Sequence, residues 1–171
     1  MLLLAKPELG KETDFKACFI GTLSDRDVAL RVVDTKSNKV IDDFVTQSRN
    51  GKIDTSFPIR QKSIYRVRVA SFGMLTHAFL IEMTPGRKVD MGRINAFLGD
   101  VNEDNVIDQR DLDLISRYRE VKAGSDRWIF GDGKNKGDRA GGNCDFNGDN
   151  IIDQKDYKIA FDNVGKRGSL K

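Results

Sequence analysis

Apolar and polar residues alternate along much of the first half of the chain, with the period of two that is typical of β-strands. Val28, Leu30 and Val32 fall on one face of such a pattern, and Asn50-Gly51 is a strong turn signal. The predicted strands lie at residues 15–20, 28–32, 40–45, 64–69 and 78–83. Short strands separated by frequent turns predict a β-sandwich.

The pattern changes near Gly99, where acidic loops followed by segments of helical spacing begin. The expected inward-facing residues are Leu112, Ile115 and Tyr118 on one helix, and Tyr157, Ala160 and Phe161 on the other. Charge changes as well, because residues 1–99 carry 16 basic and 11 acidic side chains, and residues 100–171 carry 13 and 15. We therefore expect a β-sandwich module over 1–96 and a small α domain over 97–171, divided at about 95–99.

The second domain contains an internal repeat of twelve residues, at 100–111 and 145–156. Eight of the twelve positions are identical, and oxygen-bearing side chains occupy positions 1, 3, 5, 9 and 12 of both copies. A short loop with this spacing can surround a cation, with a backbone carbonyl at position 7 as a further ligand. The predicted metal ligands are Asp100, Asn102, Asp104, Val106, Asp108 and Asp111 in the first loop, and Asp145, Asn147, Asp149, Ile151, Asp153 and Asp156 in the second.

Calcium is the cation that fits these donors best, because it takes 6–8 oxygen ligands at about 2.3–2.6 Å. The first loop carries five carboxylates and one Arg, and the second carries four carboxylates and one Lys. Without a cation, so many carboxylates within a few ångströms repel each other by several kcal/mol. Magnesium requires stricter octahedral geometry, and one His and two Cys are too few for zinc. The sequence predicts two bound Ca²⁺ ions.

Two details distinguish these loops from an ordinary helix-loop-helix calcium site. Position 12 is Asp and not Glu, and position 6 is Asn105 or Asn150 and not Gly. Residues 92–99 form a short segment with Gly at both ends, so no helix is expected before the first loop. Each unit is therefore a loop followed by a helix. The chain from Gly99 to about residue 165 thereby resembles the dockerin family, whose duplicated modules read G-D-x-N-x-D-x-x-[IV]-[ND]-x-x-D-[LY].

That resemblance implies an extracellular or cell-surface module that attaches to a cohesin-type partner, in many cases within a polysaccharide-degrading assembly. It also implies that positions 10 and 11 face outward and contact the partner, here Gln109, Arg110, Gln154 and Lys155. The segment at about 119–143 is longer than the family's usual linker, and is expected to be a flexible insertion or a further cation or partner contact. The preceding β module is similar to the immunoglobulin-like modules before some dockerins, which implies a stabilising spacer.

An alternative function is a calcium-stabilised structural subunit of a surface layer, adhesin or filament, with identical subunits as partners. Catalysis is not expected, because no nucleophilic residue stands at a recognisable catalytic spacing from the single histidine, His77. Tyr65, Phe72 and Phe79 are expected to pack in the core and not to form a sugar-binding strip. A net charge of +3 and scattered arginines do not indicate nucleic-acid binding.

No apolar run approaches the roughly 18 residues of a membrane span, and the apolar start at residues 1–5 is too short for a secretory signal. Cys18 and Cys144 are either two free thiols or one disulfide, and their spacing does not decide between these alternatives.

Overall fold

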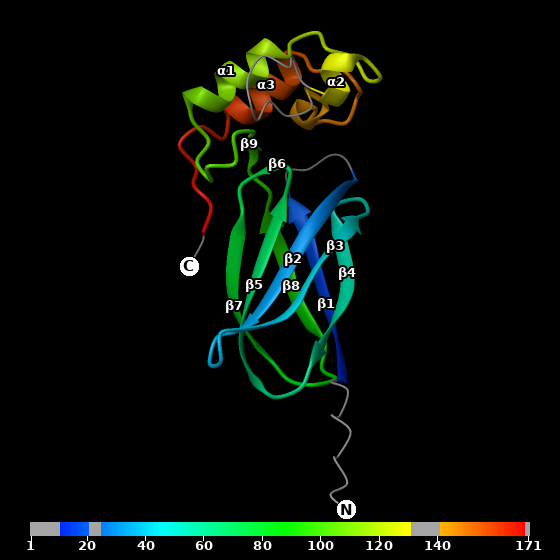
Figure 1. Cartoon of the computed structure of the whole chain (residues 1–171), viewed down its shortest axis with the longest axis vertical. Helices are drawn as coiled ribbons and strands as arrows, with labels where there is room; N and C mark the ends of the chain where they lie inside the picture. The colour runs from blue at the N-terminus through cyan, green and yellow to red at the C-terminus, as the bar shows by residue number, and fades with distance from the viewer. Residues whose placement is uncertain (1–10, 21–24, 131–140, 170–171) are drawn as a thin grey trace, which may run out of the picture.

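The chain folds into a β part and a helical part that are stacked along the long axis of the molecule (Figure 1). In this computed structural model, the described residues are 11–20, 25–130 and 141–169. The β part contains β1 (Lys11–Ile20), β2 (Arg26–Asp34), β3 (Lys39–Ser48), β4 (Lys52–Ile59), β5 (Ser63–Ser71), β6 (Gly73–Met74), β7 (His77–Met83) and β8 (Val89–Asn95). The helical part contains β9 (Leu98–Asp100), α1 (Gln109–Arg117), α2 (Asp126–Phe130), the 3-10 helix η1 (Gly141–Cys144) and α3 (Gln154–Phe161). The predicted order, a mainly β region followed by a small helical region, is confirmed.

Two sheets face each other across the core of the β part (Figure 1). One has the order β4-β1-β8 and the other has the order β3-β2-β5-β7. Neighbouring strands are antiparallel except β1 and β8, which run parallel. The core side chains include Phe15, Val28, Leu30, Val32, Phe57, Tyr65, Val67 and Val69, each at most 1% exposed. The immunoglobulin-like character of this part and its boundary at residue 96 stay predictions.

The alternating pattern correctly predicts which side chains of β2 and β5 face the core. In β1 the apolar run 15–20 is buried on one face only, since Ile20 is 44% exposed. The Asn50-Gly51 turn forms as expected, with φ angles of 51° and 70° that suit Asn and Gly. It does not connect two paired strands of one sheet, however, because β3 and β4 belong to different sheets.

The two parts are joined by a short two-stranded sheet between β6 and β9. Gly73 of β6 pairs with Asp100, and a Cβ at Gly73 would lie 2.8 Å from the ring of Phe146. The Asn163 amide donates a hydrogen bond of 2.9 Å to the carbonyl of Leu98. The helical part therefore packs closely against the end of the β part.

The segment at 119–143 contains α2 and the start of η1, and residues 131–140 lie outside the described residues. Trp128 of α2 is partly buried against the core of the helical part. Cys18 and Cys144 are both free thiols, so the disulfide alternative is not formed. Burial raises the pKa of the Cys144 thiol to about 12.

Candidate functional site

Each repeated loop ends in a helix whose first turn is capped by the loop's own carboxylates. Asp108 and Asp153, at position 9, are the N-cap residues of α1 and α3, and each accepts a hydrogen bond from the backbone two residues later. Asp111 and Asp156, at position 12, complete the capping boxes by accepting from the N-cap backbone N–H. Position 12 is thus an Asp with a structural role at the helix start, in both repeats.

The position-12 carboxylates also close the loops. Asp111 Oδ1 accepts from the N–H groups of Val101 and Asn102 at 3.0 and 3.2 Å, and its Oδ2 accepts from Asp108 at 2.9 Å. Asp156 makes the same three bonds in the second loop. Both side chains are fully buried, and burial raises both pKa values.

Positions 1, 3 and 5 turn their oxygens toward the interior of each loop. Asp100 Oδ2 accepts from the N–H of position 6 at 3.1 Å, Asn102 Oδ1 accepts from position 5 at 2.8 Å, and Asp104 Oδ1 accepts from position 7 at 3.0 Å. The second loop repeats these bonds at 3.0, 2.8 and 3.2 Å. Positions 4 and 6 have positive φ angles in both loops, at Glu103, Asn105, Gly148 and Asn150. As expected, Asn takes the conformation for which Gly is usual at position 6.

The cation at position 11 lies against the carboxylates of its own loop. Arg110 pairs with Asp104 and with Asp108 at 2.7 Å each. Lys155 pairs with Asp149 at 2.8 Å and with Asp153 at 3.8 Å. Within the described ranges, no group of three or more His, Cys, Asp or Glu is arranged to hold a metal as it stands.

The donor set nevertheless fits calcium, and Asp100 shows this most clearly. Its side chain is 3% exposed, and Oδ1 is buried without a hydrogen-bond partner in the described part of the chain. Burial, together with the neighbouring charge of Asp111, raises the Asp100 pKa to about 6. A buried carboxylate oxygen without a donor is costly unless a cation binds it. The other side-chain donors of the loop are also oxygens, and oxygen is the ligand atom that calcium, a hard cation, prefers.

Each loop is completed by the segment that follows the helix of the other repeat. In loop 1, Ile107 donates to the carbonyl of Lys166 at 3.1 Å and accepts from Gly165 at 2.9 Å. In loop 2, Ile152 donates to the carbonyl of Val121 at 3.0 Å and accepts from the N–H of Glu120 at 2.7 Å. The paired bridges are Val106 with Arg167, and Lys122 with Ile151. The repeats are therefore interlocked, and α1 and α3 lie side by side (Figure 1).

These loops and helices identify the segment when it is compared with known families. Residues 98–160 match the family model of the dockerin type I domain. The predicted resemblance to the dockerin family is thereby confirmed for this segment. The comparison with curated proteins found no match.

Two similar solved structures are interface mutants of a type II cohesin–X-dockerin complex from Acetivibrio cellulolyticus. The C-terminal interface mutant contains a chain with a TM-score of 0.60 and 16% identity, and the alignment covers 92% of this chain and 97% of that one. The N-terminal interface mutant gives 0.59 and 18%, with the same coverage. At these identities the similarity shows the fold alone, and it extends over both the β part and the dockerin segment.

The predicted partner residues are all exposed, at the starts of α1 and α3. Gln109 donates to Asp113 at 2.8 Å, while Arg110 and Lys155 contact loop carboxylates as described. The prediction that Phe161 faces inward is wrong, because its side chain is 58% exposed. It stacks on Tyr157 at 6.3 Å, and this aromatic pair on α3 is a surface feature that the sequence analysis missed.

Other candidates from the sequence have ordinary structural positions. Tyr65 is buried and donates to the Gln61 carbonyl, and Phe79 packs against the core, whereas Phe72 is only partly buried and lines a cavity beside Asp100. His77 is half-buried beside Phe79, and burial lowers its pKa. No helix in the described ranges is long and apolar enough to cross a membrane.

Proposed function

We propose that this protein is a calcium-binding attachment module in which two Ca²⁺ ions organise two loop–helix units over residues 97–171. The oxygen donors at positions 1, 3, 5, 9 and 12 and the position-7 carbonyls would hold the ions. The match of residues 98–160 to the dockerin family is the observation that carries the proposal. The buried Asp100 oxygen supports it independently, since calcium would supply the missing partner.

The partner that this module fits best is a cohesin-type protein on an extracellular scaffold or cell surface. The similar solved structures are complexes of that class, and they share the fold of both parts of this chain. The proposed contact surface combines Gln109, Arg110, Gln154 and Lys155 with the exposed aromatic pair on α3. A desolvated aromatic side chain surrounded by polar groups is the usual anchor of a protein interface. The β part, an immunoglobulin-like module over 1–96, would support this surface as a spacer.

A binding assay with purified type I and type II cohesin domains tests the proposal directly. Wild-type protein in calcium should bind at least one cohesin class, and excess EDTA should abolish binding. The double variant Arg110→Glu/Lys155→Glu should bind more weakly, mainly through a slower association rate. The variant Arg87→Glu/Lys88→Glu makes the same charge change on an exposed turn of the β part and serves as a control.

Wild-type binding to no cohesin in calcium would contradict the proposed partner. Equal weakening by the two double variants would show that net charge, and not this surface, controls association. Calcium stoichiometry, measured in parallel, should stay at two ions in both variants.

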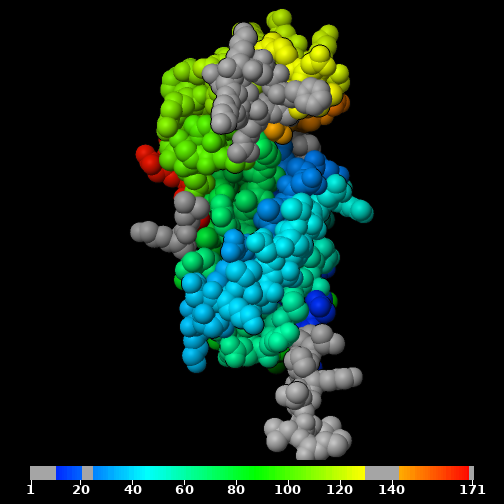
Figure 2. Space-filling view, in the orientation of Figure 1, coloured from blue at the N-terminus to red at the C-terminus, as the bar shows by residue number. Residues whose placement is uncertain are grey.

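One observation favours the alternative of a structural subunit. The outward face of the four-stranded sheet exposes Val45 and Leu80 at 64% each and Ile64 at 50%. Strand β3, which carries Val45, lies on the face of the β part seen in Figure 2. Exposed aliphatic side chains on a sheet face favour association between subunits. Concentration-dependent oligomers in sedimentation velocity, with filaments in negative stain, would support this function, and a monomer at all concentrations would remove it.

A further inference from the structure

The two calcium loops share their turn angles, most of their side-chain bonds and their interlocking bridges, but only loop 1 (100–111) is bonded to the β part through its position-6 side chain. Asn105 Oδ1 accepts a hydrogen bond of 2.7 Å from the backbone N–H of Thr76, which lies between β6 and β7. We propose that the β part fixes the position-6 residue of loop 1 and not that of loop 2 (145–156), so that loop 1 binds calcium more tightly than loop 2. This inference rests on the proposed calcium binding.

Asn105 lies in a tightly enclosed contact between three segments. Its backbone carbonyl accepts from Gly168 at 3.1 Å, while its side chain bonds to Thr76. A Cβ added at Gly168 would lie 2.1 Å from Asn105 Oδ1 and 2.3 Å from the Thr76 carbonyl. The next residue, Ser169, bonds to the N–H of Ala78 in β7. The middle of loop 1 is thus enclosed by the β part and by the C-terminal segment (residues 163–169).

The equivalent residue of loop 2 has a different environment. Asn150 has almost the same φ angle, 67° against 66°, and its carbonyl accepts from Ala123 at 3.0 Å. Its side chain is exposed, however, and the β part makes no described hydrogen bond to it. The β part instead places the charge of Arg26 close enough to Asp145 to interact with it. A cation beside a position-1 ligand opposes the binding of a second cation.

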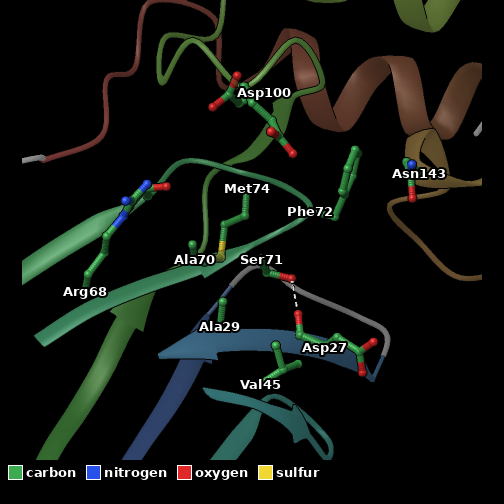
Figure 3. A pocket seen from close by; sticks show the side chains of 12 residues that line it. Asp27, Ala29, Val45, Arg68, Ala70, Ser71, Phe72, Met74, Asp100 and Asn143 are labelled. Carbon is green, nitrogen blue, oxygen red and sulfur yellow. Dashed lines mark hydrogen bonds between the residues drawn. The ribbon is translucent and has the colours of Figure 1, made fainter. Parts of the chain in front are cut away.

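The junction beside loop 1 shows how the β part reaches Asn105. A cavity of about 490 Å³ separates the outer face of β2 and β5 from the loop (Figure 3). Its lining includes Met74 of β6 and Asp100 of loop 1, with Arg68 and Asp27 on strands of the sheet (Figure 3). Beside this cavity β6 pairs with β9. Thr76, two residues after β6, thereby lies against Asn105 and donates its N–H to it.

A loop that is already ordered loses less conformational entropy when it binds an ion. Loop 1 also carries Glu103 at position 4, where loop 2 has Gly148, so its net charge is more negative by one. Asp100 is 3% exposed, whereas Asp145 is only partly buried. Preorganisation and charge therefore both favour loop 1.

The experiment measures each site separately by calorimetry with calcium alone. Asp145→Ala leaves only loop 1 able to bind, and Asp100→Ala leaves only loop 2. Asn105→Gly is added to the first background and Asn150→Gly to the second. These two changes are matched, because both remove an Asn at positive φ and both introduce a residue that tolerates it. Only Asn105→Gly removes the bond to Thr76.

We expect Asn105→Gly to weaken calcium binding at loop 1 about tenfold, the effect of losing one well-formed hydrogen bond between part-buried groups. Asn150→Gly should change loop 2 by less than about twofold, since no described side-chain bond is lost. Asn105→Asp keeps an acceptor for Thr76 and should restore tight binding, with Asn150→Asp as its charge control. A purely structural role for Asn105 would lower thermal stability without this selective change in affinity.

Equal affinities of the two loops in the single-site backgrounds, or equal effects of the two Gly variants, would overturn the inference and leave the proposed function intact. Absence of calcium binding by the wild-type chain would instead remove the proposed function itself. Two results together would establish the β part as a positioning element. Loop 1 should bind calcium more tightly than loop 2, and Asn105→Asp should raise the calcium affinity of loop 1 more than Asn150→Asp raises that of loop 2.

Discussion

Gly99 precedes Asp100, the first of the proposed calcium ligands, and lies directly against α3. Its φ is +133°, a conformation that side-chain-bearing residues rarely adopt. A Cβ at this position would lie 3.0 Å from both Cα and Cβ of Ala160, and 3.1 Å from the Ile107 side chain. Two of these atoms are held by α3 and cannot rotate away. Gly99→Ala should therefore separate α3 from β9 and destabilise the helical part.

The magnitude has two components. The unfavourable backbone conformation costs about 1–3 kcal/mol for a residue other than Gly. Overpacking of a well-filled contact adds about 1–3 kcal/mol. Gly124→Ala is a control for the first component, since Gly124 has φ +82° and nothing within 4 Å of an added Cβ. The difference between the two variants, about 2 kcal/mol, corresponds to roughly 8–16 °C in the melting temperature of a domain of this size.

The single tryptophan makes the assay specific for the helical part. Trp128 packs against the core of that part, so its fluorescence reports on its unfolding in calcium buffer. Gly99→Ala should lower the midpoint of this transition well below that of Gly124→Ala, and far-ultraviolet circular dichroism should show the β part still folded. Equal midpoints for both variants would refute the steric argument and leave only the backbone cost.

Chelation, ligand removal, pH and thiol reactivity each give a further test. EDTA should abolish the helical signal and expose residues 97–171 to proteolysis while the β part persists, because metal-binding free energy contributes to folding in small domains. Asp100→Ala and Asp145→Ala should each reduce calorimetric stoichiometry from two calcium ions to one. The Asp100 pKa is raised to about 6 in the metal-free fold, so below that pH a calcium ion must displace a proton from this carboxyl; calcium affinity at loop 1, measured by calorimetry, should therefore fall as pH is lowered from 7 to 5. Ellman's reagent should label Cys18 in the native protein, but Cys144, which is 3% exposed, only after unfolding.

The order of the two parts and the existence of the acidic loops could be predicted because their signals are local. The loop spacing places oxygens at fixed positions of one turn, and alternation places Val28, Leu30 and Val32 on one face. The parallel pairing of β1 with β8 could not be predicted, since it joins residues about 75 positions apart and depends on which sheet each strand enters. The structure describes the same local hydrogen bonds in both loops, and the ligand assignments themselves stay predictions.

Helix faces were predicted less reliably than loops. Leu112, Ile115 and Tyr118 are buried as expected, but of the three residues predicted to face inward in α3 only Ala160 is fully buried. Tyr157 and Phe161 are four residues apart and stack on each other with Phe161 mostly exposed, and periodicity alone does not distinguish such a face from an inward one. Thr76 was also missed, because it acts through a backbone N–H that leaves no side-chain signature in the sequence.

The reciprocal bonds between the repeats give a physical reason for the duplication. Every bond that a segment after one helix makes to the opposite loop recurs 45 residues along the chain, so that Glu120, Val121 and Ala123 correspond to Gly165, Lys166 and Gly168. Even the turn geometry recurs, with φ of 65° at Glu120 and 86° at Gly165. A single repeat would leave the N–H and C=O of its position-8 residue, buried at Ile107 and Ile152, without partners, each at a cost of about 1–3 kcal/mol. Two copies satisfy these groups for each other, which favours the folding of the pair over that of either repeat alone.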